Sequence, residues 1–153
     1  MSRKTTKPAP ASLDARAKAK LRAALHEAGH FIAAKHFGVA EVSGLHPVGV
    51  GQFAGKTLYG STAAFNEAVI GWCGPLAESR PGRTLKEWKD VSGVYWQLFA
   101  ENKLSKEDTD LINRHGDKRK SFNRAVEILA VEENEITQAT ASLFKQDSLF
   151  NFP

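Results

Sequence analysis

The feature that most constrains the fold is one long helical pattern near the start of the chain. It runs from Leu13 to about Phe37, with Ser12 as the expected N-cap and Gly38 as the expected stop. Beyond Ala28 the pattern is apolar nearly all round. A helix of this kind buries every face, so we expect it to lie between two layers of other elements.

Five residues within this helix form a pattern suited to metal chemistry, His26-Glu27-Ala28-Gly29-His30. Positions four apart on an α-helix differ by about 40° and one turn, so His26 and His30 project from one face. Two neutral imidazoles at that spacing make half of a tetrahedral zinc site, and buried histidines need a partner of this kind. Glu27 lies about 100° round the helix, where it can accept a proton from a metal-held water. The pattern predicts His26 and His30 as Zn²⁺ ligands and Glu27 as the general base.

A catalytic zinc site needs a third protein ligand, and several residues compete for that place. His36 has the spacing of the third metzincin histidine. However, Ala33 stands where that motif needs a turn-forming Gly, and Met1 is the only methionine, which excludes a Met-turn. A glutamate on the following helix, as in thermolysin-like enzymes, would be Glu67 or Glu78. None of these three is the preferred candidate.

Three stretches of the sequence together have the order of motifs found in one enzyme family. They are the HEAGH run at 26–30, Pro47-Val48-Gly49 followed by Gly55-Lys56-Thr57-Leu58-Tyr59, and Gly74-Pro75-Leu76-Ala77-Glu78. Over roughly residues 20–145 the chain resembles the peptidase domain of the FtsH-family ATP-dependent zinc metalloproteases, with its HEAGH motif, I-P-x-G and G-Y-T segments and G-G-R-A-A-E helix. The chain departs from that family at Pro75, which replaces the second Gly of the G-G pair, and it shows neither an ATPase module nor a membrane anchor. The resemblance implies a zincin-like domain.

The resemblance also implies where the third zinc ligand lies. In the family it is an Asp at the start of a later helix, within a G-A-x-x-D segment, and residues 105–108 fall there, with Ser105 at the small-residue position and Asp108 as the ligand. Asp110 competes, because a Leu follows it as a Leu often follows the family's Asp. Helix register favours Asp108, since the residues four and eight positions later suit a packed face, whereas those after Asp110 suit a solvated one: Ile112 and Gly116 against Arg114 and Lys118.

The rest of the chain reads as short strands followed by helices. Alternating apolar and polar residues, bounded by Gly and Pro, predict two or three strands within 39–60. Apolar residues at helical spacing predict helices over 61–80, 84–102, 105–116, 118–131 and 133–146. The stretch 51–57 imitates a phosphate-binding loop, but it has three residues between its glycines instead of four, and a strand follows instead of a helix. We therefore expect no nucleotide site. Cys73 is expected to be a small core residue.

The length and composition of the chain limit the domain organisation that we expect. At 153 residues we expect one domain over 12–146, between a disordered basic tail at 1–11 and a loose tail at 147–153. Nucleic-acid binding by the basic tail is not expected, because most such arms are only solvated. A single cysteine excludes an internal disulfide and suits a reducing cytoplasm. No apolar run approaches the 18 or so residues that a membrane span needs.

These observations predict a mainly α (α+β) fold, a zincin-like helical bundle with a small β-ribbon and a zinc site on its long helix. The expected function is that of a zinc-dependent metalloendopeptidase, with Zn²⁺ held by His26, His30 and Asp108, and Glu27 activating the water. Its expected partner is a polypeptide substrate or one dedicated protein. The alternative is a catalytically silent peptidase-fold module that regulates or binds another protein.

Overall fold

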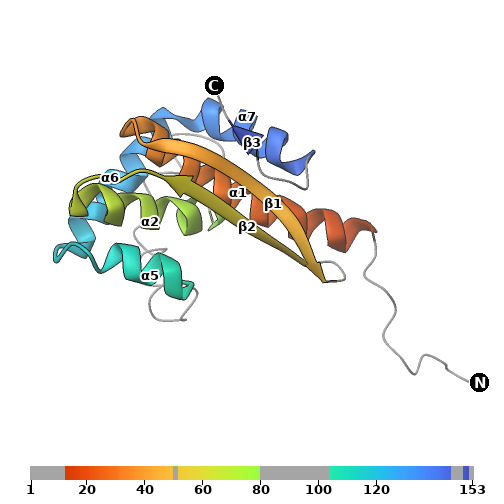
Figure 1. The fold of residues 1–153 in the computed structure, drawn as a ribbon, viewed down its shortest axis with the longest axis horizontal. Helices are drawn as coiled ribbons and strands as arrows, with labels where there is room; N and C mark the ends of the chain where they lie inside the picture. The colour runs from red at the N-terminus through yellow and green to blue at the C-terminus, as the bar shows by residue number, and fades with distance from the viewer. Residues whose placement is uncertain (1–12, 50–51, 80–103, 146–149, 152–153) are drawn as a thin grey trace, which may run out of the picture.

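The computed structural model describes residues 13–49, 52–79, 104–145 and 150–151 (Figure 1). Their secondary structure is mainly helical with a small antiparallel sheet, as predicted. The elements in chain order are α1 (Leu13–His36), β1 (Ala40–Gly49), β2 (Gln52–Tyr59), α2 (Ala64–Ser79), α5 (Lys106–Ile112), α6 (Lys118–Val131), α7 (Glu133–Phe144) and β3 (Phe150–Asn151). The helix predicted over 84–102 and the basic tail at 1–11 lie outside the described residues.

Helix α1 is the central element. It packs against α2 and α7 and lies under the β1–β2 ribbon, so it is buried between two layers as expected (Figure 1). Gly29 allows α2 to come close, because a Cβ at that position would lie 2.2 Å from the Cys73 carbonyl oxygen. The helix ends at His36, and Gly38 follows with φ +77°, the left-handed conformation that commonly terminates helices. Leu21, in the first half of the helix, is 44% exposed, because the packing begins further along the helix.

The sheet has the order β2-β1-β3, with antiparallel pairing throughout. Residues Phe150–Asn151 belong to the tail that we expected to be loose, and they pair with β1 as β3. In the β1–β2 register, Ser43 pairs with Thr57 and Leu45 pairs with Gly55. Ser43 and Leu45 are both buried. Among the strands that the structure describes, β2 lies at an edge.

Helix α2 is buried along most of its length, from Ala68 to Ala77. It continues without a break through Pro75 to Ser79. Trp72 donates a hydrogen bond from Nε1 to Ser121 Oγ at 3.1 Å and meets Phe122 edge to face. Cys73 is fully buried, as predicted for a core residue, and burial raises the pKa of its thiol.

Helix α6 packs against α2 and helix α7 packs against α1, and the two complete the core. The bounds of α6 are those predicted, with Asp117 as N-cap accepting a hydrogen bond from the Lys120 amide. Their apolar side chains face this core. Four of them are fully buried, Phe122, Leu129, Ile136 and Leu143, and two are half-buried, Val126 and Phe144.

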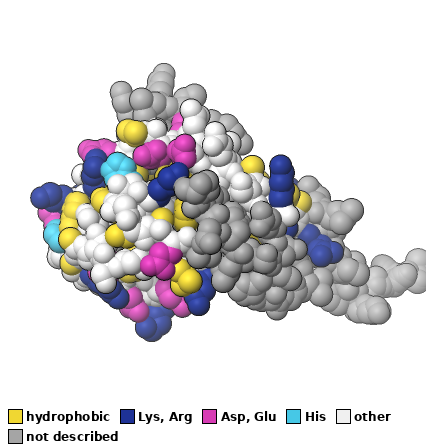
Figure 2. Space-filling model, turned by 45° about the horizontal axis from the view of Figure 1, so that its top comes forward, with side chains coloured by type: hydrophobic (Ala, Val, Ile, Leu, Met, Phe, Trp, Pro, Cys, Tyr) yellow, Lys and Arg dark blue, Asp and Glu magenta, His cyan; other side chains and the backbone are white. Residues whose placement is uncertain are grey.

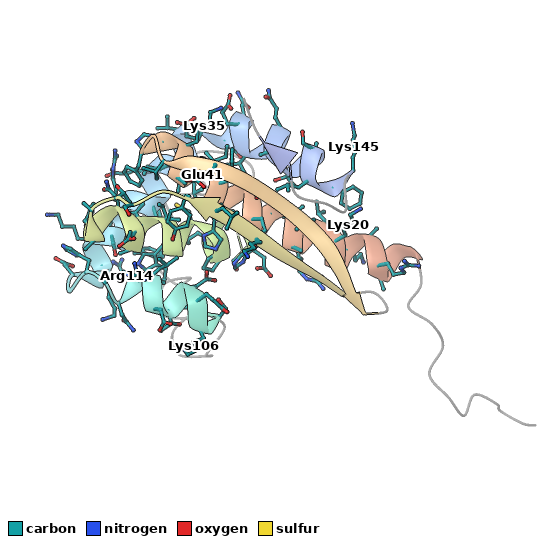
Figure 3. The ribbon with its side chains drawn as sticks, viewed as in Figure 1. Lys20, Lys35, Glu41, Lys106, Arg114 and Lys145 are labelled. Carbon is teal, nitrogen blue, oxygen red and sulfur yellow. The ribbon has the colours of Figure 1, made fainter. Side chains whose placement is uncertain are left out.

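The surface of the described part carries charges of both signs. Figure 2 shows Lys and Arg interspersed with Asp and Glu on the face that it draws. Figure 3 shows labelled charged side chains projecting away from the ribbon, and Lys35, Glu41 and Lys145 among them are exposed. Within the described ranges, we find no helix both long enough and apolar enough to cross a membrane.

Candidate metal centre

Helix α1 presents two imidazoles in one direction. His26 and His30 lie one turn apart, and their ring centroids are 4.8 Å from each other. The outer nitrogen of each ring is held by an acceptor on α2: Glu78 Oε1 lies 2.8 Å from His26 Nδ1, and the Ile70 carbonyl oxygen lies 2.7 Å from His30 Nδ1. A carbonyl oxygen only accepts, so His30 Nδ1 donates, and the neutral ring then carries its lone pair on Nε2.

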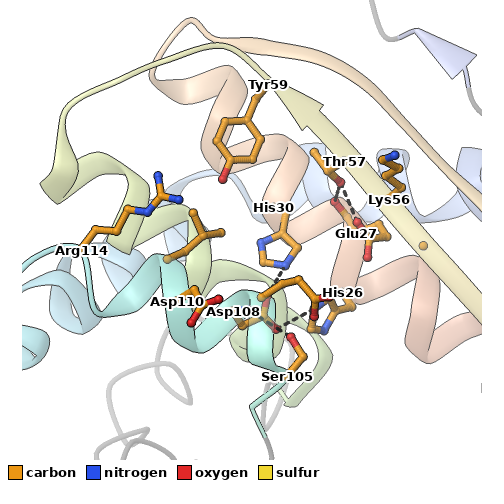
Figure 4. Close-up of a pocket in the computed structure, with 13 residues that line it drawn as sticks. His26, Glu27, His30, Lys56, Thr57, Tyr59, Ser105, Asp108, Asp110 and Arg114 are labelled. Carbon is orange, nitrogen blue, oxygen red and sulfur yellow. Dashed lines mark hydrogen bonds and ion pairs between the residues drawn. The ribbon is translucent and has the colours of Figure 1, made fainter.

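Asp108 brings a carboxylate to both Nε2 atoms from a third helix. Its Oδ1 lies 3.0 Å from His30 Nε2 and its Oδ2 lies 3.1 Å from His26 Nε2 (Figure 4). The Asp108 side chain is only 4% exposed. Its place at the start of α5 is fixed locally, because the Ser105 side chain caps the helix by accepting from the Asp108 amide at 3.1 Å. One potential ligand atom from each of the three residues lies within 4.8 Å of the others, which makes this trio a possible metal site.

The charges of the trio favour the binding of a cation. Burial alone would lower the pKa of His26, but the carboxylates of Asp108 and Glu78 raise it to about 10. Burial alone would raise the pKa of the Asp108 carboxyl, but His26 and His30 hold it well below its usual range. Asp108 Oδ2 is buried and accepts no aligned hydrogen bond from any residue that the structure describes, although His26 Nε2 is near. A buried carboxylate facing two imidazoles needs a proton or a metal ion between them, and two nitrogens with one oxygen suit a divalent metal.

Two glycines of α2 make room for this arrangement. A Cβ at Gly74 would lie 2.3 Å from His30 Nε2, so only a glycine leaves space for that ring. A Cβ at Gly71 would lie 2.7 Å from Leu111 Cβ and 3.2 Å from the Asp108 carbonyl oxygen. At Gly71 this space lets α5 pack on α2, which brings Asp108 to the histidines.

Glu27 lies beside the trio and is not part of it. Its side chain is buried, and its Oε1 accepts a hydrogen bond of 2.7 Å from the Thr57 hydroxyl on β2. Glu27 and the trio share a cleft of about 680 Å³ between β2 and α5, also lined by Tyr59 and Arg114. Burial and the nearby charge of Glu67 raise the pKa of Tyr59, so its hydroxyl keeps its proton at neutral pH. The cleft combines a possible metal site, a carboxylate and hydrogen-bond donors.

The other sequence candidates for a third ligand do not join the trio, although Asp110 lines the same cleft. Asp110 is exposed and pairs with Lys106 Nζ at 3.0 Å, and Glu67 pairs with Arg114. His36 contacts Glu132 and Arg124 instead of the trio. Glu78 does reach the site, but as the acceptor for His26 Nδ1.

The sequence did not reveal two groups that orient His30 and Glu27. The Ile70 carbonyl group that orients His30 has no sequence signal, because every residue has a carbonyl. Thr57 stood within a segment quoted for its resemblance, without a role. No protein-family model matches this chain, and neither does any curated protein.

Proposed function

We propose that this chain is a zinc-dependent metallopeptidase in which His26, His30 and Asp108 hold Zn²⁺ and Glu27 is the general base. One observation supports it above all, the buried Asp108 carboxylate set between two Nε2 atoms whose rings are already fixed through Nδ1. Imidazoles anchored in this way are typical of metal ligands. The resemblance to the FtsH-family peptidase domain points to the same reaction.

Two nitrogens and one carboxylate oxygen suit zinc in particular. Catalytic zinc sites commonly use three protein ligands from His, Asp and Glu and keep a fourth position open. Bound there, zinc would polarise a peptide carbonyl and lower the pKa of a water molecule to about 7. Glu27, which is not one of the three, would accept a proton from the water and pass it to the departing amine.

The position of β2 supports a polypeptide substrate. Four residues of β2 line the cleft, Gly55, Lys56, Thr57 and Tyr59, and β2 is an edge strand among those that the structure describes. An edge strand offers unpaired main-chain groups, and an extended peptide can pair with them whatever its side chains. Such a peptide would run along the cleft between β2 and α5, past the trio and Glu27.

Metal analysis together with hydrolysis of fluorescein-labelled casein, an unstructured protein, tests the proposal. We expect about one zinc per wild-type chain and loss of zinc in His26→Ala and Asp108→Ala. We expect Glu27→Gln to keep its zinc and to lose about 10²–10⁴-fold in casein hydrolysis, because the general base is gone. Hydrolysis by Glu27→Gln at the wild-type rate would contradict the assigned role. Zinc-loaded wild type that cleaves nothing would instead favour a silent binding module.

A further inference from the structure

A hydroxyl group on β2 holds the carboxylate of Glu27. Thr57 Oγ1 donates to Glu27 Oε1 at 2.7 Å and also lies 3.3 Å from the Glu27 carbonyl oxygen (Figure 4). A hydroxyl has one hydrogen, and the shorter, charge-assisted contact to the carboxylate is the stronger. We propose that Thr57 is a positioning residue that fixes the Glu27 carboxylate for proton transfer.

A second hydroxyl, behind the first, supports this orientation. Ser43 Oγ lies 3.0 Å from Thr57 Oγ1, and the two residues are direct partners in the β1–β2 register. Because the Thr57 hydrogen points to Glu27, Ser43 must donate to Thr57. Ser43 is fully buried, so water does not compete for its hydroxyl. A chain of hydroxyls that donate in one direction polarises each member toward the carboxylate at its end.

A glycine on the same strand shapes the space around the rest of the carboxyl group. A Cβ at Gly55 would lie 2.1 Å from Glu27 Cγ and 2.6 Å from both Cδ and Oε2. Residues 55 and 57 lie on the same face of β2, since side chains alternate along a strand. Gly55 therefore leaves the room that the Glu27 side chain occupies, and Thr57 takes up one of its two oxygens.

This arrangement assigns different roles to the two oxygens of Glu27. Oε1 accepts the hydrogen bond from Thr57, which fixes the rotation of the carboxylate. No hydrogen bond reaches Oε2 from the residues that the structure describes, so we assign proton acceptance to Oε2. A carboxylate that is already held in the reactive orientation does not lose rotational entropy when the proton is transferred. This role for Thr57 rests on the proposed function, in which Glu27 is the base. If it holds, the β1–β2 ribbon contributes to the rate of hydrolysis through Thr57.

Three variants separate positioning from simple structural support. Thr57→Val keeps the shape and the strand preference of the threonine side chain but removes its hydroxyl group. Thr57→Ser keeps a hydroxyl group at this position. Ser43→Ala removes only the second donor. For Thr57→Val we expect a fall in kcat of about 10–100-fold on labelled casein, by analogy with the loss of other orienting contacts, with KM and zinc content unchanged. We expect Thr57→Ser to recover most of kcat, and Ser43→Ala to lose less than Thr57→Val.

A measurement on the metal-free protein makes the inference independent of activity. In protein labelled with ¹³C at glutamate carboxyl groups, the Glu27 resonance is identified by its loss in Glu27→Gln. We expect this resonance to move in Thr57→Val and to stay near its wild-type position in Thr57→Ser. An unmoved resonance in Thr57→Val, or a kcat per bound zinc equal to that of wild type, would overturn the inference. Absence of any wild-type hydrolysis would refute the proposed function, while the resonance would still decide whether Thr57 holds Glu27.

Discussion

The substitution Gly74→Ala tests how the proposed zinc site is built. The added Cβ would lie 2.3 Å from His30 Nε2, 2.5 Å from Cε1 and 2.8 Å from Cδ2. The shortest of these distances falls more than 1 Å below ordinary van der Waals contact, which begins at 3.4 Å. The ring cannot yield by that amount and keep its 2.7 Å hydrogen bond to the Ile70 carbonyl group. Its Nε2 must therefore leave the position that it holds 3.0 Å from Asp108 Oδ1.

Two effects of known size follow from this displacement. Crowding a packed interior by one methyl group typically costs about 1–3 kcal/mol, so the metal-free variant should unfold at a lower temperature. Loss of a correctly placed ligand nitrogen should weaken zinc binding about 10–100-fold, by analogy with the loss of contacts that orient a ligand. That factor corresponds to about 1.4–2.8 kcal/mol of binding free energy.

Competition with a chromophoric zinc chelator measures the affinity, and thermal unfolding in excess chelator measures stability without metal. Gly116→Ala is the matched control, because a Cβ there would meet nothing within 4 Å and its backbone is not left-handed. We expect the control to behave as wild type in both assays. Wild-type zinc affinity in Gly74→Ala would show that His30 does not lie against α2 as described, and the explanation of the metal centre would fail.

Three further predictions follow from the charges of the trio. Asp108→Asn should abolish tight zinc binding, whereas Asp110→Asn, which removes only an exposed partner of Lys106, should leave zinc content unchanged; equal zinc contents in the two variants would contradict the ligand set. In the metal-free protein, the pKa of His26 is raised from 6.5 to about 10. The protonated ring therefore stabilises the folded state fully below about pH 6.5. This stabilisation is lost as the pH rises toward 10, by at most about 1.4 kcal/mol per pH unit. Zinc must displace that proton, so calorimetry in buffers of different ionisation enthalpy should show at least one proton released near pH 7.5, with any further release coming from the zinc-bound water; no release would refute the assignment.

The local parts of this structure could be predicted from the sequence. Helix α1 and the single direction of its two histidines follow from the 3.6-residue period, and the end near Gly38 follows from the conformations open to glycine. The start of α5 follows from Ser105 as N-cap, which also fixes which side of that short helix Asp108 occupies. These features depend on neighbours within about one helical turn, so the order of residues is enough to specify them.

The contacts that make those parts a site were decided only by the tertiary structure. Glu78 was considered as a ligand and instead orients His26, because α2 lies beside the outer nitrogen of that ring. Thr57 meets Glu27 only because β2 runs along α1, a pairing thirty residues apart in the chain. Such contacts depend on how helices and strands pack together, with glycines setting the closest approach, and no periodicity within one element encodes that packing.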